Sequence, residues 1–312
     1  MPISIAIHGG AGTILRHQMS RALQTEIEAA LDKALLAGYQ ILLDGGCAID
    51  AVACAVKVLE DCPHFNAGHG SVLTHREMVE MDASIMSGRG KQAGAIAGVR
   101  HIRNPIELAK SVMQDSQHVF LVGEGAEAFA FERGFTYTEQ DYFYTDRRYD
   151  QLQSMKQKGL FALSESSYPD DNKYGTVGAV ALDEEGNLAA ATSTGGITNK
   201  QYGRVGDSAV IGAGTWAENG VVAVSTTGMG EHFLQESVAS DVAARIRYLG
   251  ENAGQAAQQI IHGPLKRRGG EGGLIAMDPE GKPYFVMNSL GMYRGAITSD
   301  GEREIKIYAD QD

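Results

Sequence analysis

Two apolar segments in the middle of the chain constrain its fold more than any other feature. Residues 176–182 (TVGAVAL) and 188–194 (LAAATST) are typical of strands, and the residues between them include Gly186, which suits a turn with positive φ. Apolar residues fall on both faces of each segment, as in strands that are covered on both sides. The two segments therefore predict an antiparallel hairpin in the interior of the protein.

The turn determines which residues of this hairpin face one another. If it centres on Glu185, Leu182 lies opposite Leu188. The same register places Thr176 opposite Thr194. Directly opposed residues of an antiparallel pair have Cβ atoms about 4.5–5.5 Å apart, so the two threonine hydroxyls are expected within reach of each other. Such a pair either stabilises the sheet or places a second hydroxyl beside a reactive one.

The peptide bond before the first strand joins two different kinds of sequence. Residues 151–174 are polar, and Pro169 and Asp170 indicate an exposed loop, whereas Thr176 opens an apolar strand. The Thr176 hydroxyl could attack the Gly175 carbonyl and cut the chain, which would leave a threonine with a free α-amine. A threonine with its own N-terminal amine is a known activated nucleophile. The alternative is an ordinary strand residue, because threonine favours strands.

The rest of the sequence groups strands with strands and helices with helices. Further strands are expected at 208–213, 221–226, 273–278 and 283–288, and helices at 20–43, 48–59, 231–249 and 254–261. This order differs from the βαβ alternation of a doubly wound sheet. Two sheets packed face to face with helices outside fit better, in one domain that spans 1–312. Residues 299–312 are charged and match no motif.

Composition narrows the class of protein. The chain has 312 residues, 43% of them hydrophobic, and a net charge of −12 without a basic patch, which argues against a nucleic-acid partner. No apolar run reaches the ~18 residues that a membrane span requires, and the first residues do not resemble a signal peptide. Cys47, Cys54 and Cys62 match no zinc pattern. We expect core thiols in a cytoplasmic protein.

A series of short motifs resembles the plant-type (type III) L-asparaginases, also called isoaspartyl dipeptidases or β-aspartyl peptidases, among the N-terminal nucleophile hydrolases. The motifs follow the family's order: HGGAG (8–12), FNAGHGSVLT (65–74), MDASIM (81–86), GTVGAVALD (175–183), AAATSTGGITNK (189–200), GRVGDS (203–208) and TTGMGE (226–231). The resemblance implies an α+β fold, a four-layer αββα sandwich. It also implies self-cleavage into an α chain of 1–175 and a β chain of 176–312, assembled as a dimer of αβ heterodimers.

The resemblance further implies hydrolysis of β-aspartyl dipeptides and of the L-asparagine side-chain amide, with no cofactor for catalysis. Thr176 would be the nucleophile, its amine the general base, and Thr194 its hydrogen-bond partner. Arg204 would bind the substrate α-carboxylate, a bidentate task that suits a guanidinium, and Asp207 would bind the α-ammonium. Without the family context, Arg204 and Asp207 could instead form a surface ion pair.

Other residues carry roles that rest on the same resemblance. Thr227 and the Gly228 amide would form the oxyanion hole, although the two could also be an ordinary turn. Gly230 would let the backbone approach the ligand, and Asn66 would lie close to the nucleophile. His8 is expected to be structural.

The segment 59–69 resembles the family's sodium-binding loop. Its backbone carbonyls would coordinate a structural sodium ion: Leu59, Glu60, Cys62, Phe65, Ala67 and His69.

Three other interpretations remain open. A dinucleotide-dependent enzyme would use GAGTWA (212–217) as a degenerate phosphate loop, but no convincing βαβ unit follows it. A lipase-like hydrolase would use HGGAG as an oxyanion loop, yet the chain contains no G-x-S-x-G elbow. A catalytically inactive binding homologue is the third, and the intact Gly175–Thr176 bond argues against decay of the site.

Overall fold

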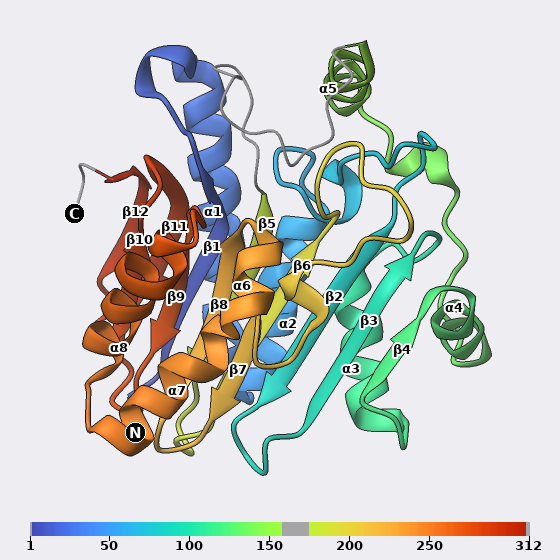
Figure 1. The fold of residues 1–312 in the computed structure, drawn as a ribbon. Coiled ribbons are helices and arrows are strands. Elements are labelled where there is room, and N and C mark those ends of the chain that lie inside the picture. The colour runs from blue at the N-terminus through green and yellow to red at the C-terminus, as the bar shows by residue number, and fades with distance from the viewer. Residues whose placement is uncertain (1, 158–174, 310–312) are drawn as a thin grey trace.

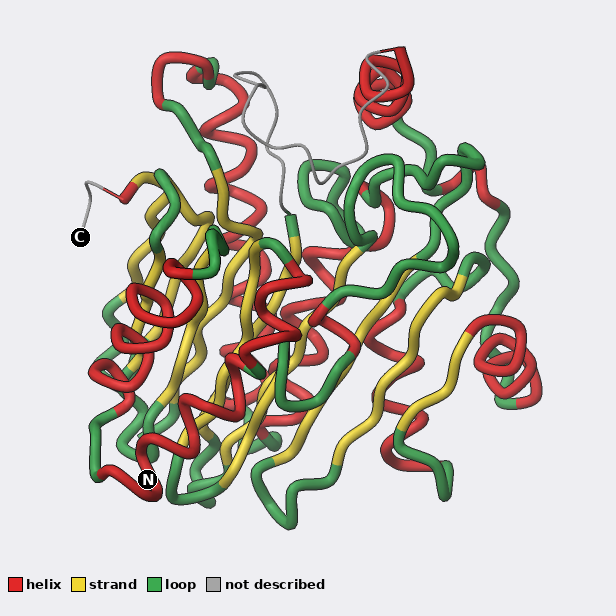
Figure 2. The backbone as a smooth tube through the Cα atoms, viewed as in Figure 1, coloured by secondary structure: helices red, strands yellow, loops and turns green. Residues whose placement is uncertain are grey.

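The computed structural model describes residues 2–157 and 175–309, which form two β-sheets with helices outside them (Figure 1; Figure 2). The strands of the larger sheet are β1 (Ser4–Gly12), β2 (Met81–Ser87), β3 (Ala93–Val99), β4 (Phe120–Val122), β5 (Thr176–Leu182), β6 (Leu188–Thr194), β11 (Gly291–Ile297) and β12 (Arg303–Tyr308). Those of the smaller sheet are β7 (Thr215–Glu218), β8 (Val222–Gly228), β9 (Gly272–Met277) and β10 (Pro283–Met287). The strand orders are β12-β11-β1-β5-β6-β2-β3-β4 and β10-β9-β8-β7.

The predicted hairpin lies in the middle of the larger sheet. β5 pairs with β6 from Thr176 opposite Thr194 to Leu182 opposite Leu188, so the predicted register is confirmed. Gly186 in the turn has φ +81°, as the turn requires. Because successive residues of a strand point to opposite faces, β5 contributes to two cores, with Val177 facing one and Val180 the other. Both faces of this hairpin are buried, which explains its unbroken apolar composition.

Helices cover the outer face of each sheet (Figure 1). The helices are α1 (Arg21–Leu43), α2 (Ala48–Glu60), α3 (Pro105–Asp115), α4 (Gly123–Glu132), α5 (Asp146–Gln157), α6 (Gly230–Glu236), α7 (Val238–Leu249) and α8 (Ala253–Ile260). α1, α2 and α3 pack on the larger sheet, and α7 and α8 on the smaller one. Within the described residues, none of these helices combines the length and apolarity needed to cross a bilayer.

Helix caps and buried apolar residues at helical spacing determine where the helices begin and which face packs on the sheet. α1 begins where the Ser20 side chain accepts a hydrogen bond from the Leu23 amide, 3.2 Å away. Ile27, Leu31 and Leu35 of α1 then repeat at helical spacing and are buried against the sheet.

Several predicted elements differ in the structure. The strand expected at 208–213 is wrong, because Gly212 adopts φ +94° and the strand begins only at Thr215. The helix expected at 231–249 is interrupted by Ser237, whose φ of +48° separates α6 from α7. Part of the loop expected at 151–174 is helical, since α5 continues to Gln157, and the remainder lies outside the described residues.

One strand near the end of the chain had no predicted counterpart, and one cysteine differs from its prediction. β12 (Arg303–Tyr308) lies within the segment 299–312, which matches no motif, and it pairs with β11 at the edge of the larger sheet. Cys47 is exposed at the start of α2, whereas Cys54 and Cys62 are partly buried. The expectation of core thiols is therefore wrong for Cys47.

A chain of buried hydroxyl groups joins the two sheets. The hydroxyls of Ser225 and Thr192 lie 2.7 Å apart, and Thr215 donates to Thr192 over 2.6 Å. Ser84 donates to Thr215 over 2.8 Å, and the His8 Nε2 atom lies 2.9 Å from the Ser225 hydroxyl. Because each hydroxyl has a partner, the polar groups can be buried without a large penalty.

Gly178 is the position where this network leaves no room for a side chain. A Cβ on Gly178 would lie 2.0 Å from Ser225 Oγ and 2.4 Å from His8 Nε2. We predict that Gly178→Ala lowers the free energy of unfolding by about 1–3 kcal/mol, the usual cost of overpacking a core. Chemical denaturation measures the change.

Gly125→Ala is the matched control. A Cβ on Gly125, in the exposed part of α4, would meet no atom within 4 Å. Alanine favours the helix over glycine, so the control is expected to stabilise the protein by roughly 0.5–1 kcal/mol. Equal stability of the Gly178→Ala variant and the parent protein would contradict the described packing.

Candidate active site

Thr176 and Thr194 form the centre of the site. Thr176 is the first residue of β5 and Thr194 the last of β6, and both side chains are buried. Thr176 Oγ1 donates to Thr194 Oγ1 over 3.2 Å. Thr194 Oγ1 in turn donates to the carbonyl oxygen of Gly175 over 3.3 Å. The hydroxyl of Thr176 and the carbonyl before it are therefore both connected to Thr194.

The loop after β6 supports this pair. The Gly196 amide donates to Thr194 Oγ1 over 3.0 Å, and Gly196 has φ +83°, which favours glycine. Asn66 Nδ2 donates to the Gly196 carbonyl over 2.7 Å, and the Gly195 amide donates to the Asn66 carbonyl over 3.0 Å. Asn66 therefore lies next to the threonine pair and holds the loop after β6 rather than Thr176 itself.

A small pocket opens at this end of the sheet, and it contains most of the residues that the sequence singles out. Its lining consists of Gly175, Thr176, Thr194, Gly196, Ile197, Arg204, Gly206, Asp207, Ser208, Gly228 and Gly230. These residues come from four separate stretches of the chain. The motifs GTVGAVALD, STGG, GRVGDS and TTGMGE thus meet in one place.

Arg204 is held by a residue that the sequence analysis did not assign. Glu231 accepts two hydrogen bonds from the guanidinium, from Nε to Oε1 and from Nη2 to Oε2, each 2.8 Å long. Burial opposes the charge of Arg204, but the Glu231 carboxylate, with Asp207 and Asp82, raises its pKa above the ordinary value. Glu231 is the last residue of the motif TTGMGE, and only this position in a motif could have indicated it.

Asp207 is a buried carboxylate with one strong hydrogen bond. Thr226 Oγ1 donates to Asp207 Oδ2 over 2.6 Å. Burial raises the pKa of Asp207 to about 6, although Thr226 and Arg204 act in the opposite direction. A carboxylate with this pKa is charged at neutral pH and loses its charge in mildly acidic solution.

Glycines leave space for a ligand between these charged groups. A Cβ on Gly230 would lie 2.8 Å from Arg204 Nη2 and 2.9 Å from Asp207 Oδ1. Gly228 has φ +153°, and a Cβ there would lie 2.4 Å from a backbone oxygen. Thr227 is fully buried and is not part of the pocket lining, and its Oγ1 accepts a hydrogen bond from the Ala11 amide over 3.2 Å.

His8 belongs to the buried network rather than to the pocket lining. Burial lowers its pKa to about 3, so the imidazole is neutral under ordinary conditions. It is fully buried against Ser225, in agreement with a structural role.

In the loop 59–69, backbone carbonyl oxygens lie close to the glycines at the end of the loop. A Cβ on Gly68 would lie 2.3 Å from the Glu60 carbonyl oxygen, and one on Gly70 would lie 2.1 Å from the Phe65 carbonyl oxygen. The Glu60 Oε2 atom is buried and has no hydrogen-bond partner in the described ranges, and burial raises the pKa of this carboxyl group to about 8. Backbone carbonyl oxygens are among the ligands that a hard cation takes. Groups of three or more histidine, cysteine or acidic side chains suited to a metal ion are absent from the residues described.

The segment 212–217 does not have the structure of a phosphate loop. It ends inside β7 instead of opening a helix, since β7 covers Thr215–Glu218. The interpretation as a dinucleotide-dependent enzyme is therefore wrong.

Comparison with known proteins agrees with the motifs. The family model described as Asparaginase matches residues 1–307. The isoaspartyl peptidase of Escherichia coli (strain K12) is 49% identical over 292 residues, which cover 93% of this chain and 91% of the relative. The isoaspartyl peptidase/L-asparaginase of Xenopus laevis is 41% identical, with 97% and 94% covered. A probable isoaspartyl peptidase/L-asparaginase 2 of Arabidopsis thaliana is 38% identical, with 98% of each chain covered. On this evidence the chain belongs to the asparaginase family.

Proposed function

We propose that the protein hydrolyses β-aspartyl (isoaspartyl) dipeptides and the side-chain amide of L-asparagine, with Thr176 as an N-terminal nucleophile. The observation that carries the proposal is the chain of hydrogen bonds from the Thr176 hydroxyl through Thr194 to the Gly175 carbonyl. The relatives named isoaspartyl peptidase or L-asparaginase support this class of substrate.

The first step is cleavage of the chain at Gly175–Thr176. Thr176 Oγ1 attacks the Gly175 carbonyl carbon, and the C–N bond breaks as the acyl group moves to the hydroxyl oxygen. Water then hydrolyses the ester, which leaves a carboxylate on Gly175 and a free amine and hydroxyl on Thr176. The Thr194 hydroxyl, a donor to the Gly175 oxygen at 3.3 Å, polarises the carbonyl that is attacked.

Substrate hydrolysis uses the groups that cleavage releases. The α-amine of Thr176 accepts the hydroxyl proton while Thr176 Oγ1 attacks the β-carbonyl of the substrate. An unperturbed α-amine has a pKa of about 7.7–8.0, so it can act as a base near neutral pH. The amine returns the proton to the leaving amine or ammonia. Water hydrolyses the resulting ester and releases L-aspartate.

The pocket residues recognise the aspartyl part of the substrate. Arg204 binds the α-carboxylate with the donors that Glu231 leaves free, and Asp207 binds the α-ammonium. Gly230 leaves room between them, because any side chain there would contact both groups. The Gly228 amide and the Thr227 hydroxyl stabilise the negative oxygen of the tetrahedral intermediate.

Further features of the mature protein are part of the same proposal. We infer the αββα sandwich of N-terminal nucleophile hydrolases, with an α chain of 1–175 and a β chain of 176–312 in a dimer of αβ heterodimers. The carbonyls of Leu59, Glu60, Cys62, Phe65, Ala67 and His69 would hold a sodium ion that stiffens this loop. Catalysis would need no cofactor, and the cytoplasm is the proposed location.

Self-cleavage should produce two fragments. Intact-mass analysis during incubation is expected to show two fragments, the second beginning at Thr176. Thr176→Ala should abolish cleavage and hydrolysis, whereas Thr176→Ser should keep part of both because the hydroxyl and amine remain. Thr25→Ala, which changes an exposed threonine of α1, should cleave normally. An active enzyme that stays a single 33.3 kDa species would refute the mechanism.

Recognition of the α-carboxylate should depend on Arg204. Each hydrogen bond to a charged group contributes about 1.5–3 kcal/mol, so Arg204→Ala should lower kcat/KM at least about tenfold. Arg245→Ala, which removes the partly exposed ion pairs of Arg245 with Asp241 and Glu251, is the control and should change kcat/KM little. A substrate analogue without the α-carboxylate should react slowly with the parent enzyme and be insensitive to Arg204→Ala. Equal rates for the analogue and β-Asp-Leu would show that the assignment is wrong.

Binding of the α-ammonium by Asp207 should depend on pH. Because protonation removes the charge that Asp207 offers to the α-ammonium, the affinity for L-aspartate should fall as the pH drops through about 6. Calorimetric titration from pH 5 to 8 measures this without a chemical step. Thr226→Val removes the hydrogen bond that lowers the pKa of Asp207, so the midpoint should move to higher pH. Asp207→Asn should bind weakly at every pH, and an affinity in the parent enzyme that does not vary with pH would contradict the role.

A further inference from the structure

Lys200 and Asp82 form a buried pair of charges directly behind the site. Lys200 Nζ lies 3.9 Å from Asp82 Oδ2, and both side chains are only 1% exposed. Asp82 Oδ2 has no hydrogen-bond partner in the described parts of the chain. Burial raises the pKa of Asp82 and lowers that of Lys200, and the charge of each residue opposes the shift of the other. Lys200 Nζ also donates to the Glu80 carbonyl over 2.7 Å. Two charges buried in this way are costly unless each keeps its partner.

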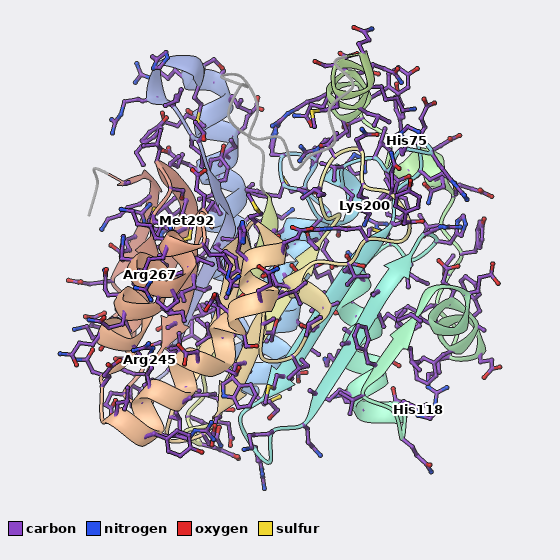
Figure 3. All side chains as sticks on the ribbon, viewed as in Figure 1. His75, His118, Lys200, Arg245, Arg267 and Met292 are labelled. Atoms are coloured by element: carbon purple, nitrogen blue, oxygen red, sulfur yellow. The ribbon has the colours of Figure 1, made fainter. Side chains whose placement is uncertain are left out.

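Asp82 is adjacent to the nucleophile's hydrogen-bond partner. In the pairing of β2 with β6, Asp82 lies directly opposite Thr194. The other carboxylate oxygen, Oδ1, accepts a hydrogen bond from the Gly98 amide over 2.9 Å, which fixes the side chain at the start of β2. Figure 3 shows Lys200 at this same end of the sheet, where the loop after β6 folds over the strands.

Lys200 also contacts the loop that carries the pocket residues. A Cβ on Gly196 would lie 3.0 Å from Lys200 Nζ and 3.5 Å from Arg204 Nη1, so two cations flank this glycine. The Gly196 amide is the donor to Thr194. The Lys200 carbonyl accepts a hydrogen bond over 3.0 Å from the amide of His75, which precedes β2. Lys200 is thus tied to the body of the protein through its side chain and its backbone.

The orientation of Arg204 depends on both Lys200 and Asp82, because their charges act on the guanidinium in opposite directions. Lys200 alone would repel the guanidinium of Arg204, whereas Asp82 alone would attract it. Together they leave little net charge beneath Arg204, which stays paired with Glu231. We propose that Lys200 and Asp82 are positioning residues, which hold Gly196 against Thr194 and keep Arg204 oriented toward the substrate. The proposal rests on the function proposed above for Thr194 and Arg204.

The test is a double-mutant cycle with Lys200→Met, Asp82→Asn and the combined variant. Each single change leaves one buried charge without its partner, so we expect kcat/KM to fall about tenfold or more for a β-aspartyl dipeptide, with a lower kcat and a higher KM. The combined variant removes both charges and should lose much less than the product of the two single losses. Lys266→Met, an exposed lysine, is the control.

Hydrogen exchange separates positioning from a general loss of folding. In Lys200→Met the amides of the segment 195–204 should exchange faster, while those of β1 and α2 stay as protected as in the parent protein. The folded fraction is measured by thermal unfolding, and kinetic constants are expressed per folded molecule. The combined variant provides a folded sample if a single variant does not fold.

Different results would contradict the positioning role of Lys200 and Asp82 and the proposed hydrolytic function. Unchanged kcat and KM per folded molecule, or losses that simply multiply in the combined variant, would overturn the positioning role. Unchanged exchange in the segment 195–204 would also overturn it, even in a protein without activity. Failure of the parent protein to hydrolyse the dipeptide would instead refute the proposed function.

Discussion

The pairing of β5 with β6 is the interaction on which the site depends. It places Thr176 against Thr194 at one end of a hairpin whose two faces are buried in separate cores. A shift of one residue in this register would turn every side chain to the opposite face, so packing of the whole sheet opposes it. The geometry of two hydroxyls is thereby maintained by the burial of an entire hairpin.

The charged residues around this hairpin are held by side chains on other elements and not by strand pairing. Arg204 and Asp207 reach the pocket from one loop, and their states are set by partners on other elements, Glu231 on α6 and Thr226 on β8. Burial makes each of these groups costly unless it is paired, which favours a single arrangement. The result is a pocket in which the empty volume lies between groups of opposite charge.

The sequence predicted the hairpin register, which depends on neighbouring residues. It did not predict the features that depend on contacts between distant segments. The turn around Gly186 sufficed for the register of β5 and β6. Glu231 lies 27 residues from Arg204, and no periodicity or spacing relates them. β12 exists only because β11 pairs with it, and the strand expected at 208–213 is lost to the backbone freedom of Gly212. Contacts between distant segments decided the cases of Glu231 and β12, and the backbone conformation of one glycine decided the third.

The order of strands in the larger sheet has a consequence for a molecule that is cut at residue 175. Strands from before and after that point alternate in blocks across the sheet: β12 and β11, then β1, then β5 and β6, then β2, β3 and β4. Neither fragment could leave without stripping hydrogen-bonded neighbours from the other. Unfolding of a cut protomer therefore also separates its two fragments, and its refolding requires them to meet again, so its recovery depends on concentration.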